Sequence, residues 1–390
     1  MVEDAQTPLL EVRNLGVEFV VDAGVLRAVD GVSLLAPCGK TVAIVGESGC
    51  GKSVTALSIL RLIPQPPGRI TGGQILFHDY PTANVPSSAR TDAGILGRGE
   101  ETQVPTYQCE QPVDLLTLSG GDIQRVRGGR IAMIFQDPLV SLNPVYTVGE
   151  QIVEAIELHQ PLRGKAARRA AIDLLGEVGI AAPKQRVDEY PHQMSGGMLQ
   201  RAMIAMALAC EPALLIADEP TTALDVTIQS QILELLRQLQ GSRGMSIIII
   251  THDLGVVAEI ADYVYVMYAG RIVEHASTDM LFAEPLHPYT QGLMRCMPRL
   301  GQTAGRLEVI PGTVPDPEQF PPGCAFHPRC QLRAKLAGRH GREAVAIDSS
   351  VGTSLLRRCV GKDNGELTGV PQLRESGTGH FVACWEVGGQ

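Results

Sequence analysis

The stretch from Thr41 to Ile63, TVAIVGESGCGKSVTALSILRLI, constrains the fold more than any other part of the sequence. Its first residues, Thr41–Val45, are apolar and predict a short buried strand, and the apolar positions that recur after the turn predict a helix. The turn between them, Gly46 to Ser53, fits the pattern G-x-x-x-x-G-K-[ST]. A strand, a glycine-rich turn and a helix in this order indicate an α/β protein that binds phosphate.

The residue types in this turn suit a nucleotide. Glycines let successive backbone N–H groups converge on phosphate oxygens, and the following helix directs its positive end at the same anion. Lys52 adds a point charge at the β- and γ-phosphates, and the Ser53 hydroxyl can ligate Mg²⁺. An ordinary glycine turn is the weaker interpretation. The predicted nucleotide contacts are Gly46, Ser48, Gly49, Cys50, Gly51, Lys52, Ser53 and Val54.

Bulk properties narrow the class of protein. A length of 390 residues allows two or three domains, and 44% hydrophobic residues support a packed core. The net charge of −9 argues against nucleic acid as the main partner. No apolar run reaches the roughly 18 residues that span a bilayer, and the acidic N-terminus shows no signal peptide. We therefore expect a cytosolic chain whose membrane role, if any, comes through a partner.

Polar residues end three further apolar runs, each of which predicts a strand. In α/β sheets, ligands bind where the carboxyl ends of parallel strands meet, so these polar residues are expected to converge. The runs and the residues that end them are 130–135 with Gln136, 213–217 with Asp218 and Glu219, and 246–250 with Thr251, His252 and Asp253.

Each of these residues has a predicted role. Asp218 suits Mg²⁺ binding through water, and Glu219 is placed to accept a proton from an attacking water. His252 is expected to contact the γ-phosphate. An acidic pair at a helix start and a structural histidine are the weaker interpretations.

Ser195, Gly196 and Gly197 precede the apolar segment AMIAMALAC and offer free N–H donors at a helix start. A second triplet, Ser119 to Gly121, lacks such an apolar segment and is predicted to be a turn. Asp225 precedes another predicted helix.

Residues 8–45 predict strands, in which Phe19 is either a core residue or an adenine-stacking one. Residues 80–113 predict a surface insertion, and residues 146–190 predict helices.

In this order, the motifs resemble the ATP-binding subunits of ABC transporters over about residues 8–300. The resemblance implies a RecA-like P-loop core with an antiparallel β subdomain, and an α-helical subdomain over about 137–210. It makes Gln136 the Q-loop residue, which also helps to hold Mg²⁺, and it makes Ala223–Asp225 the D-loop. It assigns Ser195, Gly196 and Gly197 to the signature that caps ATP on the opposite subunit. Met198 resembles the oligopeptide/dipeptide/nickel importer branch, whereas Leu199 departs from the arginine common there.

The C-terminal region, residues 301–390, resembles the small cysteine-containing extension of that branch. The similar segments are HPYTQGLM (287–294), IPGTVPDPEQFPPGCAFHPRC (310–330) and HFVAC (380–384). The resemblance implies a four-iron four-sulfur cluster on Cys324, Cys330, Cys359 and Cys384. Zinc and no metal are the alternatives. Thiolates suit either metal site, but no C-x-x-C pair is present, which makes an ordinary zinc ribbon less attractive. Cys359 lies farther from Cys330 than the family spacing.

The resemblance further implies an ATPase that drives peptide uptake from the cytoplasmic face of the membrane. Its partners would be a second ATPase subunit (identical or a paralogue), two permeases and an extracytoplasmic solute-binding protein. Three alternatives stay open: an importer of nickel or another small solute, a non-transport ABC ATPase that acts on DNA, and an exporter ATPase with an unrelated tail. The chain shows no heptads or basic stripes, which disfavours the DNA alternative.

Overall fold

The computed structural model describes residues 8–22, 24–78, 112–222, 224–297, 309–318 and 320–332. It also describes the shorter stretches 344–346, 354–356, 362–363, 366–367, 370–384 and 387. The insertion predicted for 80–113 falls almost wholly outside these ranges, but Val113 begins a short strand instead, β5 (Val113–Asp114). Among the described residues, no helix combines the length and the apolar character needed to cross a bilayer.

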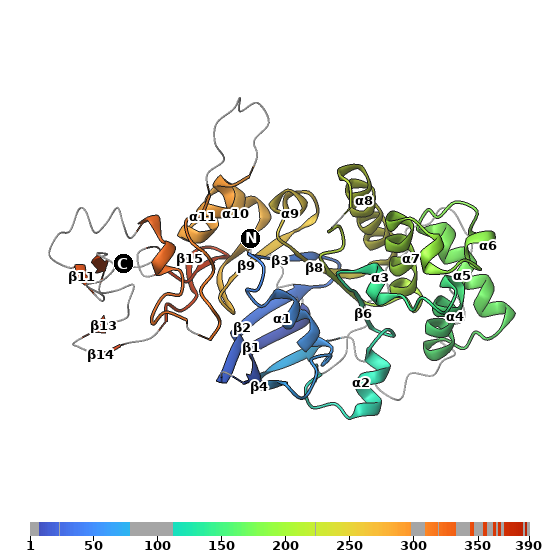
Figure 1. Ribbon diagram of the computed structural model, residues 1–390, viewed down its shortest axis with the longest axis horizontal. Coiled ribbons are helices and arrows are strands. Elements are labelled where there is room, and N and C mark those ends of the chain that lie inside the picture. The colour runs from blue at the N-terminus through green and yellow to red at the C-terminus, as the bar shows by residue number, and fades with distance from the viewer. Residues whose placement is uncertain are drawn as a thin grey trace.

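An eight-stranded sheet runs through the middle of the molecule (Figure 1). Its neighbouring strands β9, β3, β8, β7 and β6 are parallel to one another, and antiparallel strands extend it beyond β9. Every residue of β3, β7 and β8 is buried, as expected for parallel strands covered on both faces. The strands in sheet order are β15 (Arg374–Gly377), β16 (His380–Val382), β10 (Arg271–Ser277), β9 (Tyr263–Tyr268), β3 (Thr41–Val45), β8 (Ser246–Thr251), β7 (Leu214–Asp218) and β6 (Ile131–Ile134).

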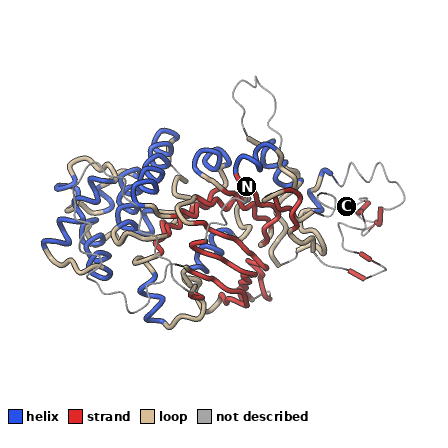
Figure 2. The backbone as a smooth tube through the Cα atoms, turned by 180° about the vertical axis from the view of Figure 1, so that it is seen from behind, coloured by secondary structure: helices blue, strands red, loops and turns tan. Residues whose placement is uncertain are grey.

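Alternate residues of the central strands face two separate apolar cores. Val42 and Ile44 of β3 belong to one core with Ile59 of helix α1 (Lys52–Ile59). Ala43 and Val45 face the opposite side of the sheet and belong to the second core, to which four further helices contribute. Those helices are α8 (Val226–Arg243), α9 (Leu254–Ile260), α10 (Thr278–Ala283) and α11 (Pro288–Arg295). Figures 1 and 2 show them on the side of the sheet opposite α1.

A second, antiparallel sheet packs beneath α1, with strand order β2-β1-β4-β5. Its long strands are β1 (Pro8–Val21), β2 (Gly24–Pro37) and β4 (Gly68–Phe77). Leu10, Val12 and Leu15 of β1 share the apolar core with α1, which fixes this sheet against the loop that α1 follows. The prediction of strands over residues 8–45 is therefore confirmed.

Helices between β6 and β7 form a helical body at one end of the molecule (Figure 2), and their apolar residues join the core that contains Ala43 and Val45 of β3. Thr147 caps the first long helix, because its hydroxyl accepts from the Glu150 N–H while the Glu150 carboxylate accepts from the Thr147 N–H. The apolar faces of these helices share one core that includes Ile152, Ala171 and Met203. The elements are α3 (Pro138–Ser141), α4 (Val148–His159), α5 (Lys165–Glu177), α6 (Pro183–Arg186), the 3₁₀ turn Pro191–Gln193 and α7 (Gly196–Leu208).

The turn predicted at Ser119–Gly121 is wrong. Ser119 caps helix α2 (Gly120–Val126), with its hydroxyl accepting from the Asp122 N–H. The sequence shows no long apolar segment here, but the helix buries two apolar residues, Ile123 and Val126. A helix of seven residues, or about two turns, needs no longer apolar pattern.

Part of the C-terminal region belongs to the core sheet, which the sequence did not indicate. Strand β16 pairs with β10, and β15 pairs with β16 at the sheet edge. The buried Glu274 carboxylate fixes this arrangement, because it accepts from His380 Nε2 at 2.8 Å and from the His287 N–H at 2.8 Å. Two short antiparallel pairs precede β15 in the chain: β11 (Ala344–Ala346) with β12 (Ser354–Leu356), and β13 (Lys362–Asp363) with β14 (Glu366–Leu367).

Candidate active site

The phosphate loop joins β3 to α1 and needs glycine at two close approaches. A Cβ on Gly46 would lie 2.2 Å from the Met267 carbonyl oxygen, and one on Gly51 would lie 2.4 Å from that of Ala28. Gly51 also has φ of +105°, a conformation that favours glycine. Lys52 is almost fully buried, and its Nζ donates to the carbonyls of Gly46 (2.8 Å) and Glu47 (3.0 Å). The loop is thus closed around its own lysine.

Ser53 and Asp218 form the second part of the site. The Ser53 hydroxyl donates to Asp218 Oδ1 at 3.0 Å, although 165 positions separate the two residues. Burial raises the pKa of Asp218, the neighbouring charge of Glu219 adds to the increase, and the Ser53 hydrogen bond and Lys52 oppose it. A hydroxyl beside a carboxylate at a strand end is the oxygen donor set that Mg²⁺ prefers. These residues therefore fit a magnesium ion bound with a nucleotide.

Two of the other predicted residues, Gln136 and His252, lie against the carboxylate of Glu219. Gln136 Nε2 donates to Oε2 at 3.1 Å, and His252 Nδ1 lies 3.3 Å from Oε1. Thr222, which sequence analysis missed, donates its hydroxyl to Oε2 at 2.8 Å. The sequence thus indicated the strand ends, but not the threonine in the turn after them.

The environment of Glu219 favours its ionised form. Burial alone would raise its pKa, but hydrogen bonds from Thr222 and His252, with the charges of His252 and Lys52, outweigh burial and lower it. Its φ of +48° is unusual for a non-glycine residue, and its N–H donates to the Ile250 carbonyl at 2.9 Å. Backbone and side chain together hold an acceptor carboxylate directly after the end of β7.

The predicted signature lies elsewhere. Ser195 caps α7, its hydroxyl accepting from the Met198 N–H at 3.4 Å, and Asp225 caps α8, accepting from the Ile228 N–H at 3.0 Å. Ile228 also lies over Gly197. Both views show α7 in the helical body, away from α1 (Figures 1 and 2). The structure therefore brings Ser53, Asp218, Glu219, Gln136 and His252 together and leaves the signature apart; Ala223 of the predicted D-loop lies outside the described residues.

Phe19 packs at the edge of an apolar core. It is partly buried against that core, and a Cβ on Gly68 of the neighbouring strand would lie 2.9 Å from its ring. Of the two interpretations of Phe19, this packing supports the core one.

Three of the four predicted cluster cysteines lie in described residues, and Cys359 does not. The pKa of Cys324 is raised to about 12, chiefly by burial and to a smaller extent by electrostatic interaction with Cys384 and Cys330. Within the described part of the chain, no group of three histidines, cysteines or carboxylates is arranged to hold a metal. These three cysteines are neighbours, but they do not form a metal site by themselves.

Comparison with known proteins agrees with this geometry. The profile of the ABC transporter family matches residues 29–222, and that of the oligopeptide/dipeptide transporter C-terminal region matches residues 273–335. A peptide import ATP-binding protein of Brucella abortus (strain 2308) is 49% identical over 323 residues, which cover 83% of this chain and 87% of that protein. The oligopeptide transport ATP-binding protein AppD of Bacillus subtilis (strain 168) is 47% identical over 322 residues, 83% of this chain and 88% of AppD.

A solved structure shares the fold. The dimeric ATP-binding cassette MJ0796, in a post-hydrolysis state bound to ADP and Pi, matches with a TM-score of 0.55 at 22% identity, over 69% of this chain and 98% of that one. The fold and the site define a P-loop nucleoside triphosphatase of the ATP-binding cassette class. The chain belongs to the ABC transporter ATP-binding proteins that carry the oligopeptide/dipeptide C-terminal region, which are ATPases coupled to transport.

Proposed function

We propose that this chain is the ATP-hydrolysing subunit of a peptide importer and works peripherally on the cytoplasmic face of the membrane. The observation that carries the ATPase part is the Glu219 carboxylate, held by Gln136 and Thr222 beside the Ser53–Asp218 pair. Peptide as the cargo is supported by the match of residues 273–335 to the oligopeptide/dipeptide transporter region and by the relatives, which are named as peptide import and oligopeptide transport ATP-binding proteins.

In this proposal the phosphate loop binds the triphosphate. Lys52, whose ammonium now bonds two loop carbonyls, would turn to the β- and γ-phosphates when a nucleotide displaces those bonds. Ser53, Asp218 and Gln136 would hold Mg²⁺, which neutralises charge on the phosphates when bound. The loop residues that would contact nucleotide are Gly46, Ser48, Gly49, Cys50, Gly51, Lys52, Ser53 and Val54.

Glu219 would act as the general base. An ionised carboxylate can accept a proton from water, and hydrogen bonds to Glu219 lower its pKa and keep it ionised near neutral pH. Gln136 and His252 would sense the γ-phosphate, because they reach the Glu219 carboxylate from the ends of β6 and β8, the strands on either side of β7. After loss of the γ-phosphate, Gln136 and His252 would keep only their contacts with Glu219.

The site would be completed by a second ATPase subunit. Within one chain, α7 with Ser195, Gly196 and Gly197 lies away from α1. The signature N–H groups would therefore bind a nucleotide held by the phosphate loop of the second subunit. Asp225 would lie at the same interface. ATP held between two subunits would close the pair, and hydrolysis would reopen it.

The permease contact would lie next to Gln136. Large apolar side chains are exposed in the segment that leads from β6 into the helical body, and Val140 is 82% exposed. Apolar side chains gathered in this way mark a surface for a protein partner. The exposed residues are Phe135, Val140, Val145 and Tyr146. Their place beside Gln136 would connect a membrane partner to the γ-phosphate.

An iron–sulfur cluster in the C-terminal region also stays a proposal. It is supported by the proximity of Cys324 to Cys330 and Cys384, and it needs Cys359 as the fourth ligand. Protein purified without oxygen should be brown and contain about four iron atoms per chain, and Cys330→Ser should reduce both. A colourless, iron-free protein with free thiols would reject the cluster.

Transport is tested with the chain in its complex. Capture of the tagged full chain in mild detergent should bring down two permeases, and proteoliposomes containing them should take up labelled peptide only with ATP and a solute-binding protein. Uptake of Ni²⁺ but not peptide would favour the small-solute importer, and stimulation of ATPase activity by DNA would favour the non-transport ATPase. Either result would overturn peptide import.

A further inference from the structure

The C-terminal region reaches back to the phosphate loop through one arginine. Arg329 is followed directly by Cys330 and lies 282 positions after Glu47, the second residue of the loop. Its Nη1 donates to Glu47 Oε2 at 2.6 Å, and its Nη2 donates to Oε1 at 2.9 Å. The arginine side chain is only 4% exposed. The parallel pair of bonds is the geometry in which guanidinium and carboxylate bind most strongly.

Glu47 is fixed at every polar group. Its backbone N–H donates to the Tyr289 hydroxyl at 2.9 Å, and its carbonyl accepts from Lys52 Nζ at 3.0 Å. Tyr289 lies on α11, so the loop is bonded to two segments of the region after β10. The carbonyl bond is the one that Lys52 would give up for phosphate, which leaves Tyr289 and Arg329 as the constant supports.

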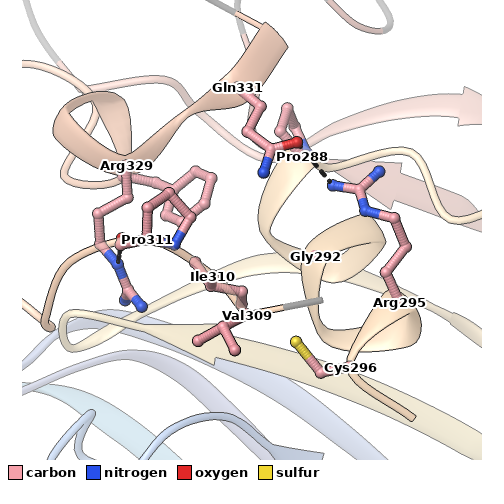
Figure 3. A pocket seen from close by; sticks show the side chains of 10 residues that line it. Pro288, Gly292, Arg295, Cys296, Val309, Ile310, Pro311, Arg329 and Gln331 are labelled. Atoms are coloured by element: carbon pink, nitrogen blue, oxygen red, sulfur yellow. Dashed lines mark hydrogen bonds between the residues drawn. The ribbon is translucent and has the colours of Figure 1, made fainter. Parts of the chain in front are cut away.

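Arg329 is itself held rigidly. Its Nε donates to the Pro311 carbonyl at 2.9 Å, and its guanidinium lies 5.9 Å from the ring centroids of both Tyr268 and Phe326. Figure 3 shows it at one wall of a pocket between α11 and residues 309–331. Across that pocket, Arg295 Nη2 donates to Gln331 Oε1 at 3.4 Å. An anchored guanidinium loses little freedom when it binds a carboxylate, so it can hold the loop in one conformation.

A fixed loop has two effects on an approaching triphosphate. Ordering the loop costs conformational entropy, and a loop already ordered does not incur that cost on binding. A carboxylate one residue from Gly46 would also repel phosphate, and the paired guanidinium cancels that charge. Both effects act on nucleotide affinity rather than on the proton transfer at Glu219.

We propose that Arg329 is a positioning residue for nucleotide binding: it holds Glu47, and through Glu47 the phosphate loop, in the conformation that accepts a triphosphate. The C-terminal region is then a structural part of the ATPase site and not only an appendage. This inference rests on the ATPase and is independent of the cargo, so peptide transport could fail its own test while Arg329 keeps this role.

The test is a double-mutant cycle on the purified full chain, with dissociation constants measured for a fluorescent ATP analogue in Mg²⁺. Arg329→Gln and Glu47→Ala should each weaken binding about 5- to 20-fold, and the double variant should be no weaker than the worse single variant. KM for ATP should rise in all three while kcat at saturating ATP stays within about twofold. Additive losses, or Glu47→Ala binding like the wild type, would overturn the proposal.

Two further variants separate positioning from folding. Arg243→Gln removes a comparable Arg–Glu pair, since Arg243 Nη2 donates to Glu177 Oε2 at 2.6 Å between α8 and α5. Arg243→Gln should leave nucleotide affinity unchanged. An equal loss of affinity in Arg243→Gln would show that losing any Arg–Glu pair weakens binding, and would overturn a specific role for Arg329. If Arg329→Gln does not fold, Arg329→Lys keeps the charge but not the paired bonds and should still weaken binding, as should Glu47→Ala on the loop itself. Wild-type affinity in either would reject the role.

Discussion

The side-chain amide of Gln136 donates a 3.1 Å hydrogen bond to the carboxylate of Glu219 across 83 positions of sequence. The bond exists because β6 and β7 are parallel neighbours and therefore end at the same edge of the sheet. It ties the residue that leads into the helical body to the proposed base. In the proposed mechanism, this contact would carry a change at the nucleotide to the helical body.

Glu219→Gln should abolish turnover while leaving ATP binding intact. The substituted amide keeps the shape of the side chain but cannot take a proton from water, so kcat should fall by about 10²- to 10⁴-fold. The dissociation constant for ATP should change by less than about threefold, because Lys52 and the loop are untouched. Single-turnover hydrolysis and equilibrium binding, measured on the same preparation, check both parts.

Glu234→Gln is the matched control, because Glu234 lies exposed on α8 and bonds only Gln238 and Arg237 among described residues. It should hydrolyse ATP at the wild-type rate. Turnover retained in Glu219→Gln would show that another group takes the proton.

Most of the site could be predicted because its residues follow strong local patterns. Buried strands read as continuous apolar runs, and the polar residue that ends each run was therefore visible for Gln136, Glu219 and His252. The loop at Gly46 carries its own spacing rule. In each of these patterns, the residues that set the local structure are next to, or the same as, the residues that would do the chemistry.

The rest depends on contacts between distant segments. Nothing local to Arg329 indicates that it meets Glu47, and a lone arginine near cysteines reads as a surface charge. The pairing of β16 with β10 was equally hidden, because three residues give too short a pattern and the buried Glu274 that fixes it lies far away in the sequence. The helix after Ser119 was missed because its seven residues bury only two apolar side chains.

Asp218→Asn should raise the Mg²⁺ requirement. Asp218 accepts from Ser53 at 3.0 Å, and removing its charge weakens both the orientation of that hydroxyl and the attraction for the cation. The Mg²⁺ concentration that gives half-maximal ATPase activity should rise by about 10- to 100-fold. Asp279→Asn, at an exposed position in the first turn of α10, should not shift it. An unchanged Mg²⁺ titration in Asp218→Asn would exclude this residue from the metal site.

Two glycines in helices should respond to alanine in opposite directions. A Cβ on Gly149 in α4 would lie 2.4 Å from the Val187 carbonyl oxygen, so Gly149→Ala must displace backbone and should destabilise the chain by about 1–3 kcal/mol. A Cβ on Gly176 in α5 would approach only Pro183 Cγ, at 3.7 Å, so Gly176→Ala should stabilise by about 0.5–1 kcal/mol. Urea unfolding followed by circular dichroism measures both, and equal signs would contradict the packing described.

His287 should make the protein less stable in acid. It is fully buried, its Nδ1 accepts from the Tyr289 N–H at 3.1 Å, and burial lowers its pKa to about 3. The unfolded chain has a histidine pKa of about 6.5, so between about pH 6.5 and pH 3 the unfolded state binds a proton that the native state does not. The free energy of unfolding therefore falls as pH falls through this window, by up to about 1.4 kcal/mol per pH unit, and is unaffected by this group above it.

The variant His287→Asn isolates this contribution. Asparagine can accept the same N–H at the helix start but does not titrate, so it keeps the cap and loses the pH dependence. Between pH 7 and pH 5 the wild type should lose about 2 kcal/mol more stability than the variant in matched urea titrations. Other acid-sensitive groups, His275 among them with its pKa lowered to about 4 by burial, are present in both proteins and cancel in the difference. Parallel pH profiles for the two proteins would show that His287 is protonated, or reached by water, in the native state.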